Sequence, residues 1–111
     1  MSSNIKGGKT PGQNKQDEIV DVEEYAKEGK VPPSGARYRI RIDKQKFEVD
    51  AASMTGRELL ELAGKRPPER YRIDMKLRGG ETRLVPLDES ADFTTPGLER
   101  FMTLPLDQTE G

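Results

Sequence analysis

The fold is decided by residues 37–64, which read RYRIRIDKQKFEVDAASMTGRELLELAG. In the first half of this stretch apolar and charged residues alternate, which is typical of strands that are buried on one face. A polar turn at residues 43–45 divides the alternation and predicts a two-stranded hairpin. The second half changes to the spacing of a helix. These 28 residues therefore predict two strands followed by a helix.

The predicted helix carries signals at both of its ends. Thr55 stands at the N-cap with Glu58 three residues later, which is the pattern of a capping box. Met54 and Leu59 occupy the two positions of a hydrophobic staple across the same helix start. Gly64 supplies the C-terminal stop. A helix from about residue 56 to 63 is therefore expected.

Downstream of the helix the alternation returns in residues 70–78 and predicts a third strand. Gly79 and Gly80 form a turn, and residues 81–87 return as a shorter strand. Residues 88–98 are rich in turn formers and are expected to hold one helical turn. The last strand, residues 100–104, is short and mostly apolar, so we place it in the middle of the sheet.

These elements predict an α+β fold. A helix that follows a hairpin covers the apolar face of the sheet, and a strand-helix-strand connection within one sheet is right-handed. The expected architecture is a β-grasp, with a mixed sheet of four to five strands and one helix packed across it. We expect this domain to span residues 37–105.

The two flanks of the domain have a different composition. Residues 1–36 are poor in apolar side chains and are predicted to be a disordered arm. The arm contains an acidic patch, residues 17–28, in which some apolar residues are spaced for one side of a short helix closed by Gly29; the alternative is a solvated tail. Those residues are Ile19, Val20, Val22, Tyr25 and Ala26. Residues 106–111 are predicted to be a flexible tail ending in glycine.

Composition excludes several classes of function. The chain has 111 residues, of which 35% are charged, with no cysteine and no histidine. Thiol nucleophiles, Cys/His zinc sites and imidazole bases are therefore excluded, and we expect a protein that is no enzyme and has no metal or cofactor of its own. No signal peptide and no membrane span is predicted, so we expect a cytoplasmic protein that does not enter a membrane. The net charge of −1 gives no bulk attraction to nucleic acid.

The outward face of the predicted sheet is basic. The functional interpretation of this face is a docking surface for an acidic partner or nucleic acid, or for the chain's own acidic residues 17–28; the alternative is a solvated strand surface. We also expect the face to lack an apolar recognition patch. The candidate surface residues are Arg37, Arg39, Arg41, Arg70, Arg72, Lys76 and Arg78.

Five short segments resemble the bacterial ubiquitin-like modules called multiubiquitin domains. They are YRIRID (38–43), MTGREL (54–59), LAG (62–64), RYRI (70–73) and FMTLP (101–105). The resemblance implies that a C-terminal glycine is adenylated with ATP by an activating enzyme, passed on as a thioester and joined to a target. It also implies activating, conjugating and deubiquitinating-type enzymes of the JAB metalloprotease kind as partners, a monomer when free, and a role in defence against phage.

The last residues of the chain fit this chemistry. Gly111 is the expected conjugation residue, and Gln108, Thr109 and Glu110 form the tail before it. A residue without a Cβ threads a narrow channel and permits close approach to a phosphate or a thiolate. The chain carries one glycine at this end where ubiquitin has two. The rival hypothesis is a β-grasp interaction module that is never conjugated and binds through the arginine-rich face.

Overall fold

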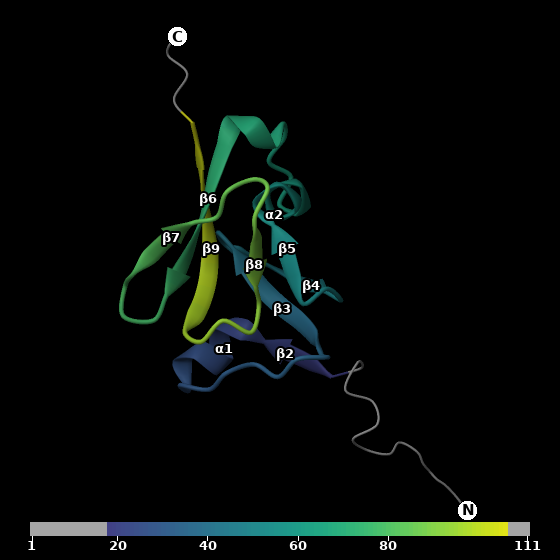
Figure 1. Ribbon diagram of the computed structural model, residues 1–111, viewed down its shortest axis with the longest axis vertical. Helices are drawn as coiled ribbons and strands as arrows, with labels where there is room; N and C mark the ends of the chain where they lie inside the picture. Colours follow the sequence, from purple (N-terminus) through teal and green to yellow (C-terminus); the bar gives the residue numbers. More distant parts are fainter. Residues whose placement is uncertain (1–17, 107–111) are drawn as a thin grey trace, which may run out of the picture.

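The computed structural model describes residues 18–106. The disorder predicted for residues 1–17 and the flexibility predicted for residues 107–111 lie outside this range. The strands and helices carry the labels of Figure 1. In chain order they are β2 (Ile19–Asp21), α1 (Val22–Lys27), β3 (Arg37–Ile42), β4 (Gln45–Val49), β5 (Ser53–Thr55), α2 (Gly56–Leu62), η2 (Pro68–Arg70, a 3₁₀ turn), β6 (Tyr71–Leu77), β7 (Thr82–Leu84), β8 (Ser90–Asp92) and β9 (Leu98–Pro105).

Within residues 18–106, six strands form one mixed sheet with β9 inside it (Figure 1). β9 runs parallel to β3, where Ile42 faces Phe101, and antiparallel to β6 along most of its length. β4 pairs with β3 and β7 pairs with β6, while β5 and β8 form a separate pair. The α+β class, the β-grasp architecture and the central position of the last strand are confirmed. The sheet has more strands than the predicted four to five.

The core lies between this sheet and α2. The alternation in β3 buries Tyr38, Ile40 and Ile42 and leaves its arginines on the other face, as predicted. Leu59 and Leu60 of α2 are fully buried, and α2 contacts β6 and β5. Three rings lie at the centre of the core: the Phe93 ring is 5.9 Å from that of Tyr38 and 6.2 Å from that of Phe101.

The start of α2 has the predicted capping box. The Glu58 N–H donates to Thr55 Oγ1 at 3.1 Å, and the Thr55 N–H donates to Glu58 Oε1 at 2.9 Å. Gly56 follows the cap at a position where a Cβ would lie 2.6 Å from the backbone oxygens of Val85 and Pro86. The helix therefore begins against the segment that follows β7, and this contact requires glycine.

We expect Thr55→Ala to lower the free energy of unfolding by about 1 kcal/mol, because the Glu58 N–H loses its partner. Urea unfolding followed by circular dichroism measures this change. Thr55→Ser is the matched control, because it keeps the accepting hydroxyl and should stay close to the wild type. Equal losses for the two variants would contradict the role of the cap.

The prediction of a helical turn in residues 88–98 is wrong. β8 and turns occupy this segment, and the Asp92 carboxylate accepts hydrogen bonds from the Thr94 N–H at 2.8 Å and the Thr94 hydroxyl at 2.6 Å. Such side-chain bonds to nearby backbone compete with helix formation. The Phe93 N–H donates to the Ala52 carbonyl, which ties the segment to the start of β5 instead.

The predicted arm is also corrected, because residues 19–36 belong to the folded body. β2 pairs in parallel with β3, so that Ile19 faces Arg37, and Val20, Val22 and Ala26 are buried. The physical reason is that, without β2, one edge of β3 would lack a partner over most of its length. β4 pairs along the other edge, and β9 pairs with β3 only at Ile42. The β2–α1 segment (residues 19–27) occupies the remaining space, where α1 contacts both β3 and β9. Neither α-helix of the described residues is long and apolar enough to cross a membrane.

Candidate functional site

The first candidate is the C-terminal end of β9, which we call the exit strand because the predicted tail follows it in the sequence. β9 ends at Pro105, and the Leu106 N–H donates to the Arg70 carbonyl at 2.8 Å. The chain is therefore held against the start of β6 up to Leu106. The predicted conjugation residue Gly111 and the predicted tail residues Gln108, Thr109 and Glu110 lie beyond the described residues.

Asp43 fixes the end of β9 from the other side. This residue has a φ of 55° in the hairpin turn between β3 and β4, a conformation that aspartate tolerates better than most residues. Its carboxylate accepts hydrogen bonds from the Thr103 N–H at 2.9 Å and the Thr103 hydroxyl at 2.6 Å. Its own N–H donates to the Phe101 carbonyl at 2.9 Å. The hairpin turn and the exit strand therefore form one rigid unit.

Exposed leucines lie beside the exit. Leu84, Leu104 and Leu106 are 52%, 55% and 41% exposed. Leu104 faces Arg72 and Leu84 faces Asp74 across the strands, which places both on the outward side of the sheet. The outward face, for which no apolar recognition patch was expected, therefore carries exposed leucines beside its charged residues. The sequence could have predicted the outward position of Leu104. Side chains alternate between the two faces of a strand, so if Phe101 is buried, Leu104 points outward.

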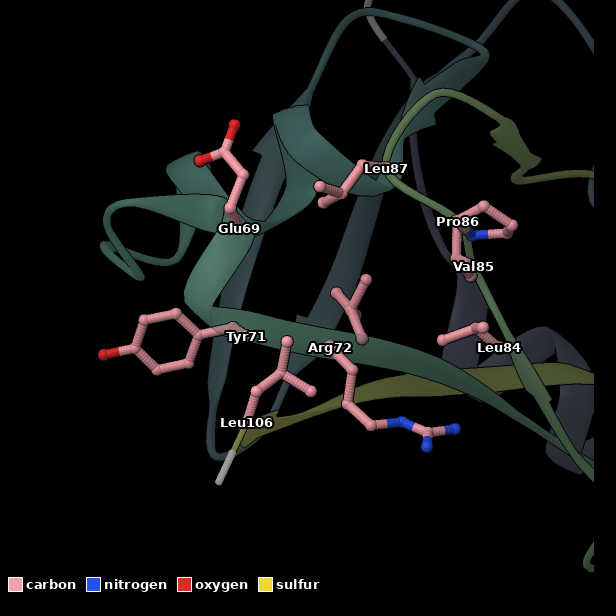
Figure 2. A pocket seen from close by; sticks show the side chains of 9 residues that line it. Glu69, Tyr71, Arg72, Leu84, Val85, Pro86, Leu87 and Leu106 are labelled. Atoms are coloured by element: carbon pink, nitrogen blue, oxygen red, sulfur yellow. The ribbon is translucent and has the colours of Figure 1, made fainter. Parts of the chain in front are cut away.

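A mainly apolar pocket of about 280 Å³ adjoins these leucines (Figure 2). It opens where β6 loses its partner: the Val85 N–H still donates to the Ile73 carbonyl, but by Leu87 the chain has turned toward the start of α2. Figure 2 shows Leu106 and Tyr71 on one side of the pocket and Leu84 on the other. The lining residues are Glu69, Tyr71, Arg72, Ile73, Leu84, Val85, Pro86, Leu87 and Leu106.

The predicted arginine-rich surface is largely neutralised by carboxylates of the same chain. Five of its seven residues form ion pairs within the described part, while Arg70 and Arg78 have no ionic partner there. The nitrogen-to-oxygen distances of these pairs are 2.8 Å for Arg37–Asp50 and Arg39–Glu48, 2.9 Å for Arg41–Glu23, and 3.0 Å for Arg72–Asp74 and Lys76–Glu99. The face is therefore not a free basic patch.

Two carboxylates of the β2–α1 segment contribute to this neutralisation, as one of the sequence-based alternatives proposed. The Glu23 side chain is only 8% exposed and lies 2.9 Å from Arg41, 3.5 Å from Lys46 and 4.0 Å from Arg100. Asp21 accepts a hydrogen bond from the Lys46 ammonium at 2.7 Å. The segment thus brings negative charge to the outward face.

The pKa of each carboxyl lies below its ordinary value. For Glu23, burial raises the pKa, but the hydrogen bond from Arg41 and the charges of Arg41 and Lys46 together lower it by more. For Asp21, burial likewise raises the pKa, and the bonds from Lys46 and the Glu24 N–H lower it by more. Because the folded pKa values are depressed, both groups stabilise the fold above the unfolded pKa, and that stability is lost as the pH falls through the folded pKa.

We expect the free energy of unfolding to fall as the pH drops below about 4.5, and Glu23→Gln to flatten this dependence. At pH 7 the same variant should lose about 1–3 kcal/mol, because Arg41 is left without its charged acceptor. Urea titrations at pH 7 and pH 3 measure both effects. Glu24→Gln, at a side chain that is 54% exposed, is the matched control. Equal losses for the two variants would show that the ion pairs of Glu23 contribute nothing specific to stability.

Within residues 18–106 there is no group of three or more acidic side chains placed to hold a metal ion. A family model described as Multiubiquitin matches residues 38–105, which is more than half of the chain. No curated protein and no solved structure gives a significant match.

Proposed function

The chain belongs to the Multiubiquitin family, and from this premise we propose that it is a modifier whose C-terminal Gly111 carboxylate is activated with ATP and joined to targets. Its body is a ubiquitin-like module. The observation that carries the proposal is the fixed exit: Leu106 is bonded to Arg70, and Thr103 is clamped by Asp43. A rigid body that releases its chain at a defined point suits a carboxylate that another protein must grasp.

The length of the tail sets the distance at which an enzyme acts. Residues 107–111 follow Leu106, and five residues span at most about 17 Å. An enzyme that holds the Gly111 carboxylate therefore works within this distance of the body and meets the surface around the exit. Leu84, Leu104 and the adjoining pocket supply the apolar contacts for that encounter.

The proposed chemistry belongs to partner enzymes. The Gly111 carboxylate attacks the α-phosphate of ATP and pyrophosphate leaves. An enzyme thiolate then attacks the acyl carbon and AMP leaves, and a nucleophile on the target finally displaces the thiolate. This chain supplies the carboxylate, the tail and the recognition surface, while activating, conjugating and JAB-type deubiquitinating enzymes act on it. Bacterial origin, defence against phage and a cytoplasmic location stay predictions.

The rival function, binding through the arginine-rich face, has less support. Five of the seven cations that it needs are already paired with carboxylates of the same chain. An acidic partner would have to break these pairs to reach the arginines. The test that separates the two functions is ATP-dependent activation of the chain with and without Gly111, since a binding module does not depend on that residue.

We expect Leu104→Glu to slow ATP-dependent activation at least about tenfold, because one lost apolar anchor is worth on the order of 2 kcal/mol. The thermal midpoint should not change, because this side chain is exposed. The rate of enzyme adduct formation measures the effect. Val31→Glu is the matched control: this side chain is 54% exposed against 55% for Leu104 and lies in the link between α1 and β3. Unchanged activation of the Leu104 variant would exclude the exit surface from recognition.

A further inference from the structure

The lysines of the described residues differ in how far they are engaged. Lys46 and Lys76 pair with Asp21 and Glu99, and their side chains are 30% and 28% exposed. Lys27 and Lys30 pair with Glu24 and Glu28, and the Lys65 ammonium lies 6.0 Å from the centre of the Tyr71 ring. Lys44 is exposed and, within residues 18–106, has no ion pair, hydrogen bond or ring contact. Among the lysines of residues 18–106, it is therefore the one whose amine is most available for reaction.

The backbone that carries Lys44 is held in place. Lys44 follows Asp43 in the hairpin turn, and Asp43 is bonded through its N–H to Phe101 and through its carboxylate to Thr103. The turn is therefore fixed to the central strand of the sheet while the Lys44 side chain projects from it. The fixed turn is a suitable support for an acceptor amine, because only the side chain has to be ordered for the attack.

A hollow of about 400 Å³ lies beside this amine. Its lining residues are Ile42, Asp43, Lys44, Gln45, Ala63 and Lys65. The two lysines outnumber the single carboxylate in the lining, that of Asp43, so the hollow carries a net positive charge. The tail of this chain carries the opposite charge, with Asp107 and Glu110 before Gly111. The charges of hollow and tail are therefore complementary.

We infer that Lys44 is an acceptor for Gly111 of a second copy of this chain, whose acidic tail lies in the hollow. This inference rests on the proposed function. The neutral Lys44 amine attacks the carbonyl carbon of the Gly111 thioester, a C–N bond forms, the C–S bond breaks, the thiolate leaves and the amine proton passes to solvent. The product is an isopeptide-linked dimer, and repetition gives a chain of modules.

The chain's own tail is not the occupant. Thr103 is level with the turn, and β9 continues away from it to Leu106, about 10 Å further on. To fold back toward Lys44, the tail would need about four residues for the reversal. Gly111 would then lie beside Leu106 and would not reach the hairpin turn that carries Lys44. A second copy has no such restriction, because its tail approaches the hollow from outside.

The test uses full chains and a thioester prepared chemically at Gly111, so that activation by an enzyme is bypassed. The donor carries Lys44→Arg, and the acceptor lacks Gly111 and cannot act as a donor. The dimer is then digested with a protease that cleaves after glutamate. Cleavage after Glu110 of the donor leaves Gly111 on the acceptor lysine, and mass spectrometry of the peptides identifies that lysine. We expect this glycine mainly on Lys44, and at least a tenfold slower dimer formation with a Lys44→Arg acceptor. Lys30→Arg, at a side chain that is 65% exposed, is the control and should react like the wild type.

Two further arms test the charge argument. Added salt and Asp107→Asn in the donor should both slow dimer formation. Glycine spread over many lysines, or an unchanged rate with the Lys44→Arg acceptor, would overturn the inference. Absence of dimer would overturn it as well, provided that the thioester still acylates free lysine. Because the thioester is made without an enzyme, these results are separate from a failure of enzymatic activation, which would count against the proposed function.

Discussion

A chain that begins at residue 37 is expected to lose cooperative unfolding, although it contains the whole segment matched by the family model. Its removed part includes Val20 and Val22, which are 1% and 2% exposed. Each buried valine contributes on the order of 2 kcal/mol, and removal of Glu23 leaves Arg41 without its partner. The summed loss of about 5 kcal/mol equals the total stability of many small domains.

Urea unfolding of this shortened chain, followed by circular dichroism, measures the loss. The control is a chain that begins at Glu18, which keeps every contact described for the β2–α1 segment. We expect a cooperative transition for the control and a broad transition or none for the shortened chain. Equal midpoints for the two chains would show that the β2–α1 segment is dispensable for the fold.

The sequence predicted those parts of the fold that rest on local patterns. The alternation of Tyr38, Ile40 and Ile42 and the pairing of Thr55 with Glu58 each lie within a few residues, and the structure has both. β2 was missed because three residues are too few to show a period of two, and because its burial depends on an edge of β3 that only the folded sheet defines.

The candidate site was predicted less completely, for a related reason. The arginines of β3 lie on the face opposite the buried residues, but Arg70 and Arg78 lie outside the strands, and the carboxylates that pair with the cations come from several separate segments. Glu23 is 18 residues from Arg41 and Glu99 is 23 residues from Lys76. Nothing in a run of acidic residues indicates which one becomes buried. Sequence reasoning therefore identified the basic residues, and the structure shows that five of the seven form ion pairs within the molecule.

Removal of Gly111 is expected to abolish activation altogether. Without it the carboxylate belongs to Glu110, whose side chain has a Cβ and an additional charge at the reacting position. Gly111→Ala should retain some activation but lose on the order of 100-fold, because a small displacement of the reacting carboxylate is enough to cost that much. Neither change should alter the unfolding midpoint, since every contact that defines the core lies within residues 18–106. Adenylate formation measured by ATP–pyrophosphate exchange gives both values.

The most direct measurement is the intact mass of the full chain after incubation with ATP and an activating enzyme from the same genome. The account predicts an adenylate or a thioester-linked enzyme adduct with the chain that ends in Gly111, and none with the chain that lacks it. An unchanged mass for both chains, with an enzyme shown to be active on another modifier, would contradict the claim that this protein is conjugated through Gly111.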